Sequence, residues 1–160
     1  MRIVLAVVGR LKAGPERELS TRYLERAQAA CRQVGITAVE IREFEESRAR
    51  RPEDRKAGEG EAIAELLNKG GRLIVLDERG KSLTSEAFAQ DVATARDSAS
   101  GAYVIAIGGP DGVDEDLRSK AAIVLSFGAM TWPHQMVRVM ALEQIYRAVT
   151  ILSGHPYHRA

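Results

Sequence analysis

The chain has 160 residues, of which 45% are hydrophobic and 28% are charged, close to the averages for a soluble globular protein. This length favours one domain, residues 1–160, with a core of its own. The 23 basic and 22 acidic side chains nearly cancel, which argues against a protein that coats nucleic acid through a general positive surface. No apolar run approaches the ~18 residues of a membrane span. The single cysteine excludes an internal disulfide, and we expect a cytoplasmic protein.

The first half of the chain alternates strand and helix patterns. The apolar start at residues 2–8 is too short for a signal peptide and lacks a cleavage pattern, so we expect a strand there. Apolar side chains at helical spacing predict a helix over residues 15–33. An alternating strand at 37–42 follows. The next predicted helix, at 53–69, stops at a pair of glycines.

The second half contains three apolar strands, each followed by a loop and a helix. In chain order we expect a strand at 72–76, a loop at 77–81, a helix from a cap at Thr84 or Ser85 to residue 97, a strand at 102–107, a helix at 114–121, a strand at 122–125 and a helix at 133–152. Strands without alternation, separated by helices, indicate a mostly parallel sheet covered by helices on both faces. The predicted fold class is therefore α/β.

Three loops that follow strands contain glycine and are candidates for a ligand site. They lie at residues 76–81, 108–113 and 126–132. In open parallel sheets, ligands bind beyond the carboxyl ends of the strands, and glycine lets the backbone approach a ligand closely. One such loop is weak support for a site, but three in consecutive units favour a ligand of nucleotide size.

The familiar phosphate-binding motifs do not fit these loops. Residues 80–82 imitate the end of a P-loop, but Val75 stands where that motif requires glycine. Pro110 takes the place of the second glycine in the dinucleotide motif and has no backbone N–H to donate. We therefore expect loop backbone and apolar walls to hold an adenosine-type cofactor with a small charged tail.

The C-terminal residues 154–159 read Gly-His-Pro-Tyr-His-Arg and concentrate titratable side chains. Tyr157, His158 and Arg159 have the chemistry to orient a substrate, shift its proton equilibrium or bind phosphate. A frayed polar tail is the alternative if these residues are considered alone. His155 and His158 are three residues apart, but no nearby cysteine or clear carboxylate completes a ligand set, so no metal is expected.

Two further features leave alternatives open. The apolar stripe of the last helix suits the core, and part of it also suits a helix-packed homodimer interface: Met136, Val137, Met140 and Ala141. A basic cluster lies around the start of the second predicted helix and consists of Arg48, Arg50, Arg51, Arg55 and Lys56. Because acidic residues lie among these, a solvated charged loop is the simpler interpretation.

Several segments carry a resemblance to a known family. They are Leu76–Lys81, Ile107–Gly112, Leu125–Phe127 leading through Met130–His134, the helix with Arg138, Glu143 and Tyr146–Ala148, and the ending His155–Arg159. In these segments and over its whole length, the chain resembles the bacterial ribosomal RNA large subunit methyltransferase H family, which belongs to the SPOUT superfamily of knotted methyltransferases. The match of the C-terminal third is the most specific.

The resemblance implies an S-adenosylmethionine-dependent enzyme that methylates ring nitrogen 3 of a pseudouridine in a hairpin loop of large-subunit (23S) rRNA. It also implies action on assembled ribosomes, a homodimer with its active site at the subunit interface, and a C-terminal trefoil knot. The implied cofactor-binding residues are Leu76, Gly108, Phe127, Gly128, Ala129, Met130, Thr131 and Trp132. The implied catalytic residues are Tyr157, His158 and Arg159. Trp132 departs from the family, in which another apolar residue often stands there.

The implied chemistry gives the tail residues distinct roles. Arg159 or His158 would stabilise the anion that develops on the imide nitrogen, and Tyr157 would help fix the base. No residue stands out as a general base. Arg138, Arg147 and the basic cluster are candidates for the RNA-facing surface. The alternatives are a SPOUT methyltransferase of another RNA such as tRNA, and a non-enzymatic nucleotide- or RNA-binding module that assists ribosome assembly.

Overall fold

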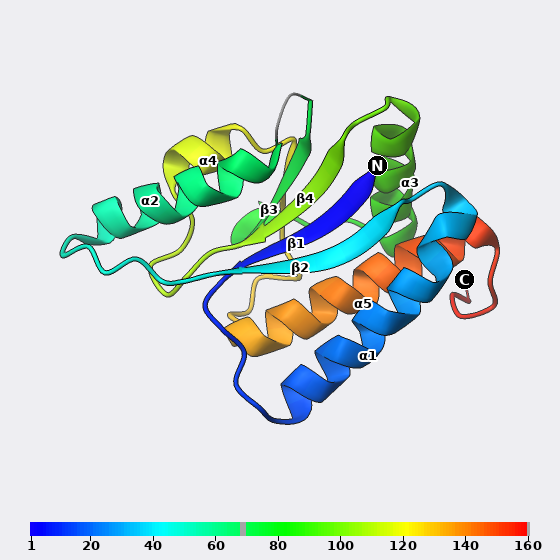
Figure 1. Cartoon of the computed structure of the whole chain (residues 1–160), viewed down its shortest axis with the longest axis horizontal. Coiled ribbons are helices and arrows are strands. Elements are labelled where there is room, and N and C mark those ends of the chain that lie inside the picture. Colours follow the sequence, from blue (N-terminus) through cyan, green and yellow to red (C-terminus); the bar gives the residue numbers. More distant parts are fainter. Residues whose placement is uncertain (68–69, 160) are drawn as a thin grey trace.

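The computed structural model describes residues 1–67 and 70–159. Its centre is a sheet whose strands are β1 (Arg2–Val8), β2 (Ala38–Phe44), β3 (Arg72–Lys81), β4 (Ala102–Ile107) and β5 (Ile123–Leu125). The strand order is β2-β1-β4-β3-β5, and every pair is parallel (Figure 1). The predicted parallel sheet is therefore confirmed. Because all strands run the same way, their carboxyl ends meet at one edge.

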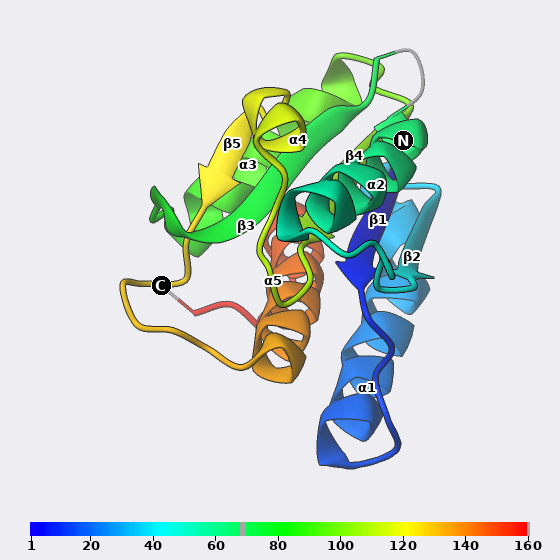
Figure 2. The same cartoon turned by 90° about the vertical axis from the view of Figure 1, so that its left-hand side faces the viewer.

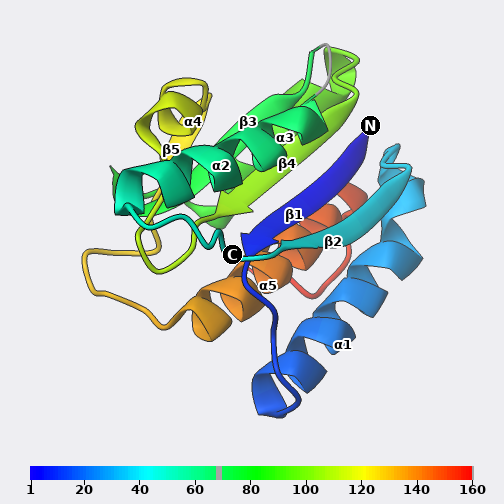
Figure 3. The same ribbon diagram turned by 60° about the vertical axis from the view of Figure 1, so that its left-hand side comes forward.

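Helices cover both faces of this sheet, as the apolar strands predict. They are α1 (Pro15–Ala30), α2 (Pro52–Ala64), α3 (Ser85–Asp97), α4 (Glu115–Ser119) and α5 (His134–Ser153), with short 3-10 turns η1 (Cys31–Val34) and η2 (Glu65–Leu67). Figures 2 and 3 show α2 and α4 on the opposite side of the sheet from α1 and α5. The buried side chains of α3 belong to the same core as those of α1 and α5.

The two cores follow from the alternation of side chains along each strand. Ile3, Leu5 and Val7 of β1 point into the core under α1, α3 and α5. Val4 and Ala6 point into the smaller core under α2 and α4. All five are at most 2% exposed. Burial of each of the four larger side chains therefore stabilises the fold by roughly 1.5–3 kcal/mol, and burial of Ala6 stabilises it by less. Burial on both faces explains why the strand sequence shows no polar alternation.

The helix ends agree closely with the sequence. The Thr84 hydroxyl accepts a hydrogen bond from the N–H of Ala87 (3.1 Å) and begins α3. The helix predicted to reach residue 33 tightens into η1 after Ala30 and stops at Gly35, whose φ of 74° is left-handed. The predicted helix at 53–69 is seen as α2 and η2, and residues 68–69 lie outside the described residues.

The prediction of a loop at residues 77–81 is wrong, because β3 continues to Lys81. Lys81 pairs with Leu125 of β5 after an irregularity that begins at Leu76. Gly80 permits this approach: a Cβ at that position would lie 2.6 Å from the carbonyl oxygen of Val124. The polar residues of this segment look like a loop in the sequence because they form the rim of a cavity rather than part of the core.

Two expectations about the whole chain stay predictions, namely the single domain and the C-terminal trefoil knot. Within residues 1–67 and 70–159, no helix is both long enough and apolar enough to cross a membrane.

Candidate functional site

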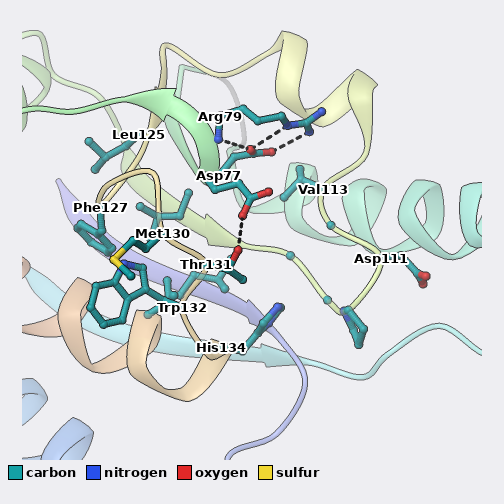
Figure 4. Close-up of a pocket in the computed structure, with 18 of the residues that line it drawn as sticks. Asp77, Arg79, Asp111, Val113, Leu125, Phe127, Met130, Thr131, Trp132 and His134 are labelled. Carbon is teal, nitrogen blue, oxygen red and sulfur yellow. Dashed lines mark hydrogen bonds and ion pairs between the residues drawn. The ribbon is translucent and has the colours of Figure 1, made fainter.

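A cavity of about 450 Å³ lies at the carboxyl ends of β3, β4 and β5. The glycine-bearing loops that follow β4 and β5 meet residues 76–79 of β3 around it (Figure 4). Its apolar walls come from Leu76, Ile107, Leu125, Phe127, Trp132 and Val137. A cavity of this size accommodates a ligand as large as a nucleoside with a substituent, since small-molecule sites commonly measure about 300–1,000 Å³.

The loop after β4 folds back on itself so that its backbone forms one wall. Gly112 donates its N–H to the carbonyl of Gly109 (3.0 Å), and the φ of Gly112 is 88°. A Cβ at Gly108 would lie 2.7 Å from the carbonyl oxygen of Gly112 and 2.8 Å from a methyl carbon of Val113. Only glycine fits at position 108 without moving the backbone, so residues 108–112 form a glycine loop with a tightly fixed shape.

The loop after β5 is fixed by side-chain hydrogen bonds. The Ser126 hydroxyl accepts from the N–H of Gly128 (3.1 Å) and lies 2.8 Å from its carbonyl oxygen. Gly128 has a φ of 119°, which strongly favours glycine. Thr131 donates its hydroxyl to a carboxylate oxygen of Glu78 (3.0 Å), a contact drawn at the mouth of the cavity in Figure 4. A negative charge therefore lies beside the apolar walls.

Asp77 holds the rim of the cavity to α4. One of its carboxylate oxygens accepts from both Arg79 and Arg118 at 3.0 Å, and the other accepts from the backbone N–H of Arg79 at 2.8 Å. The side chain of Asp77 is only 9% exposed. The hydrogen bond from the Arg79 side chain, followed by the other cationic contacts, lowers the pKa of Asp77 below its ordinary value, although burial opposes the shift.

We expect Asp77→Asn to destabilise the fold by about 1–3 kcal/mol at neutral pH, the value of charged hydrogen bonds in a buried setting. The lowered pKa gives this effect a pH dependence. The carboxylate contributes its full stabilisation well above pH 3.8, the ordinary pKa, and loses it as the pH falls through the lower pKa of the folded state. Chemical denaturation at several pH values should show the two proteins converging in acid. A difference that is the same at every pH would contradict this role.

The cavity brings together most residues that the resemblance implies for cofactor binding. Leu76, Gly108, Phe127, Gly128, Met130, Thr131 and Trp132 all line it. Ala129 does not; its side chain is exposed on the outside of the loop. Val113, the last residue of the candidate loop 108–113, lines the cavity too, and so do His134 and Val137, which were not predicted as site residues. The only signal of His134 and Val137 is their position shortly after the loop at 126–132.

The C-terminal tail lies apart from this cavity and packs against the second half of α5. Tyr157 donates its hydroxyl to Glu143 (3.0 Å), and its ring packs 4.7 Å from that of Tyr146, measured between ring centroids. His158 lies between Glu86 of α3 (2.7 Å) and Arg147 (3.3 Å). Arg159 is exposed. Figure 1 shows the tail at one end of α5 and the cavity loop at the other.

Within the described residues, none of residues 155–159 lines the cavity of the same chain. On α5, Val137 lines the cavity and Glu143 contacts the tail, and these two residues are about 9 Å apart along the helix axis.

Burial raises the pKa of Tyr157, and the neighbouring Tyr23 and Glu143 act in the same direction. Tyr157 therefore stays protonated at neutral pH and acts as a hydrogen-bond donor.

Arg138 is a correction to the predicted RNA-facing surface, because it is only 5% exposed. Its guanidinium forms an ion pair with Glu43 and donates to the carbonyl of Gly9 (3.0 Å). This pair ties α5 to β2 and to the loop after β1. Arg147 is partly buried and forms an ion pair with Glu143 under the tail. In the predicted dimer stripe, Ala141 is buried, whereas Met136 is 40% exposed.

Metal binding has no visible site in the part of the chain that the structure describes. No group of three or more histidine, cysteine, aspartate or glutamate side chains there is arranged to hold an ion.

The amino-acid sequence matches a known family over nearly its whole length. Residues 1–158 match a family model described as "Predicted SPOUT methyltransferase". The chain belongs to the SPOUT methyltransferase family.

Its curated relatives define the branch more narrowly. A protein of Beijerinckia indica subsp. indica named ribosomal RNA large subunit methyltransferase H is 56% identical over 160 residues, covering all of both chains. Proteins of the same name from Methylocella silvestris and Methylobacterium radiotolerans are 54% and 56% identical. The alignments cover 99% of this chain in both cases, and 99% and 98% of those relatives.

A solved structure is also similar at low identity. It is titled as a probable methylase family protein from Haemophilus influenzae Rd KW20, with a TM-score of 0.49 and 13% identity, and it covers 99% of this chain and 70% of that one. The family assignment rests on the sequence matches.

Proposed function

We propose that this protein uses S-adenosylmethionine to methylate ring nitrogen 3 of a pseudouridine in a hairpin loop of large-subunit rRNA, within assembled ribosomes. The observation that carries the proposal is the cavity at residues 76, 108 and 127–132, to which the family resemblance assigns the methyl donor. The relatives' name supports ribosomal RNA as the substrate. The pseudouridine and its ring nitrogen come from the resemblance alone.

The residues of the cavity fit such a donor. Leu76, Ile107 and Phe127 offer apolar surface to a purine ring, and the fixed glycine loop exposes backbone groups that read its polar edge. The carboxylate of Glu78 at the mouth would attract the positive charges of a sulfonium and an α-ammonium group. The absence of a P-loop or dinucleotide motif agrees with a donor that carries no phosphate.

A bound S-adenosylmethionine would supply a methyl group attached to a positively charged sulfur. Transfer of this methyl group breaks its bond to the sulfur, which becomes a neutral thioether and is therefore a good leaving group. The protein's contribution is to place an acceptor nitrogen in line with that bond, and positioning of this kind is worth several kcal/mol. The imide nitrogen must lose its proton before or during attack. A cationic group from Arg159 or His158 would stabilise the resulting anion, and the protonated Tyr157 hydroxyl would hold the base by a hydrogen bond.

The position of the tail supports a homodimer with a shared active site. In one chain the tail packs at Glu143 and Glu86, away from the donor cavity. Three large apolar side chains around the cavity loop are exposed: Met130 (75%), Trp132 (39%) and Met136 (40%). Exposed apolar groups clustered on one loop and helix end are typical of a protein interface. We propose that a second chain covers them and brings its own tail to the cavity.

The tail residues provide a direct test of the catalytic proposal. Tyr157→Phe and Arg159→Ala should each lower kcat on ribosomes by about 10²-fold or more, the range seen when a transition-state hydrogen-bond donor is removed. The affinity for S-adenosylhomocysteine should stay within about twofold, because both residues are proposed to contact the acceptor base and not the methyl donor. Full turnover in both variants, with unchanged donor binding, would show that the tail is not catalytic.

The proposed function itself is tested by transfer of a labelled methyl group from S-adenosylmethionine to ribosomes that lack the modification. Label should appear in large-subunit rRNA. Its appearance only in tRNA would identify a methyltransferase with another substrate, and no transfer to any RNA would favour a non-enzymatic binding module. Hairpin RNA alone should be a poorer substrate than ribosomes, because a nearly neutral enzyme has few phosphate contacts of its own.

A further inference from the structure

The loop between β2 and α2 carries three exposed guanidinium groups, and Arg55 links it to the glycine loop of the cavity. We call residues 45–51 the arginine loop; it contains Arg48, Arg50 and Arg51, all exposed. Figure 1 shows this loop beside the loop between β4 and α4, at the edge where the strands end. Exposed arginines are well suited to RNA, since each guanidinium can bind a phosphate through two parallel hydrogen bonds.

Acidic residues also lie in and beside the arginine loop: Glu45 and Glu46 belong to it, and Glu53 and Asp54 follow it. Glu45 forms an ion pair with Arg10 (3.0 Å). Glu53 and Asp54 lie in the first turn of α2, where negative charge is favoured by the helix dipole. The three arginines therefore remain the side chains of this loop that are best placed to meet a polyanion.

Arg55 joins the arginine loop to the glycine loop of the donor cavity. Its Nε and Nη2 atoms donate to the two carboxylate oxygens of Asp111 at 2.7 and 3.0 Å. Its Nη1 atom lies 3.1 Å from the carbonyl oxygens of both Ala49 and Arg50. The Asp111 side chain points away from the cavity in Figure 4, so the paired hydrogen bonds from Arg55 hold the glycine loop from the side that faces away from the cavity.

Glu59 makes a second connection one turn further along α2. It is only 7% exposed, and one carboxylate oxygen accepts from the backbone N–H of Ser47 (2.9 Å). Its other oxygen is close to the glycine loop, because a Cβ at Gly109 would lie 3.2 Å from it. Residues of α2 thus contact the arginine loop through Arg55 and Glu59, and they approach the glycine loop at Asp111 and Gly109.

We propose that Arg55 and Glu59 are positioning residues that couple two binding events: contact of RNA phosphates with the arginine loop, and binding of the methyl donor beside the glycine loop. The inference rests on the proposed function. A displacement of the arginine loop on RNA binding would move the carbonyls that Arg55 bonds, and through Arg55 the carboxylate of Asp111. By thermodynamic reciprocity, a bound donor also strengthens RNA binding by the same factor.

The test measures the affinity of labelled S-adenosylhomocysteine by equilibrium dialysis, with and without ribosomes that lack the modification. This probe carries no transferable methyl group, so the result does not depend on turnover. In the unaltered protein, ribosomes should raise the affinity at least about fivefold. Arg55→Lys keeps the charge but cannot make the four contacts, so the ratio of its affinities with and without ribosomes should fall to about one.

Asp111→Asn provides a second variant on the other side of the link, in case Arg55→Lys folds poorly. It should also lose the enhancement, and the double variant should be no worse than either single one, because both break the same connection. Enhancement that survives in both folded single variants overturns the coupling.

The arginines are tested by replacing Arg48, Arg50 and Arg51 with glutamine. Ribosome affinity should fall, and the slope of log affinity against log salt should become shallower by roughly 2–3, since each phosphate that is no longer neutralised removes about 0.7–0.9 from the slope. A matched control removes three exposed arginines from the α1 side: Arg17, Arg22 and Arg32. An unchanged affinity and salt slope in the first variant overturn the proposed binding of RNA by the arginine loop.

The outcomes separate the two proposals. If the unaltered protein methylates ribosomes but the arginine and Arg55 variants behave like it, only the inference fails. If the unaltered protein neither binds ribosomes nor transfers a methyl group to them, the proposed function fails and the inference with it.

Discussion

Replacing Gly108 by alanine should reduce methyl transfer by at least about 10²-fold, since a displacement of about 1 Å in a reacting pair costs that much. The new Cβ would lie 2.7 Å from the carbonyl oxygen of Gly112 and 2.8 Å from Val113. Both contacts are closer than real Cβ atoms approach, and the first is to backbone, which cannot rotate away. The glycine loop must therefore move, and it forms one wall of the cavity that we propose holds the methyl donor.

The same variant should bind S-adenosylhomocysteine at least tenfold more weakly in a calorimetric titration, while losing only about 1–3 kcal/mol of stability to overpacking. Gly101→Ala is the matched control, because nothing lies within 4 Å of a Cβ there. That variant should keep both donor affinity and activity. Normal donor binding in a folded Gly108→Ala protein would show that this cavity is not the donor site.

A mixed dimer should reveal whether the tail of one chain serves the cavity of the other. One chain carries Gly108→Ala and the second carries both Tyr157→Phe and Arg159→Ala, each with its own purification tag. A symmetric dimer has two equivalent sites. If the tail acts across the interface, this mixed dimer has one intact site and about half the activity of the unaltered dimer. Homodimers of either variant should be nearly inactive.

A reciprocal mixed dimer sharpens the result. It pairs an unaltered chain with one that carries all three substitutions. With tails acting across the interface, its one good cavity receives the defective tail, so the dimer should be inactive. With tails acting within a chain, the outcomes of the two mixed dimers reverse. The physical basis for the first outcome is the separation of Tyr157 and Glu143 from the cavity in a single chain.

Much of the fold is readable from the sequence because the strands are buried on both faces. Residues 3–8 and 102–107 are continuous apolar runs, and the structure has strands at these positions. The extension of β3 through residues 77–81 could not be predicted in the same way. Its polar side chains face the rim of a cavity, and its strand geometry depends on pairing of Lys81 with Leu125, which is a long-range contact.

In the candidate site, too, local sequence features could be predicted and long-range contacts could not. The glycine-bearing loops stand out in the sequence, and parallel strands bring their ends to one edge. Side-chain contacts between distant residues leave no such signal. Arg138 looks like a surface arginine on a helix, but its partner Glu43 lies 95 residues away, and together they are partly buried. Arg55 and Asp111, separated by 56 residues, likewise reveal their link only in the folded chain.

The tail is the segment whose interpretation changes most. As a sequence, residues 155–159 look like a set of catalytic groups attached to the last helix. In the structure, Tyr157 and His158 are bound to Glu143 and Glu86 of the same chain, apart from the cavity. A catalytic tail is therefore consistent with this fold if a second chain completes the site.

The most direct measurement is the mapping of the methylated nucleotide after reaction of the purified protein with ribosomes that lack the modification and with labelled S-adenosylmethionine. We expect one labelled nucleotide, a pseudouridine methylated at ring nitrogen 3 in a hairpin loop of large-subunit rRNA. Label at a different base or in another RNA, or no label in the ribosome, would contradict the proposed function.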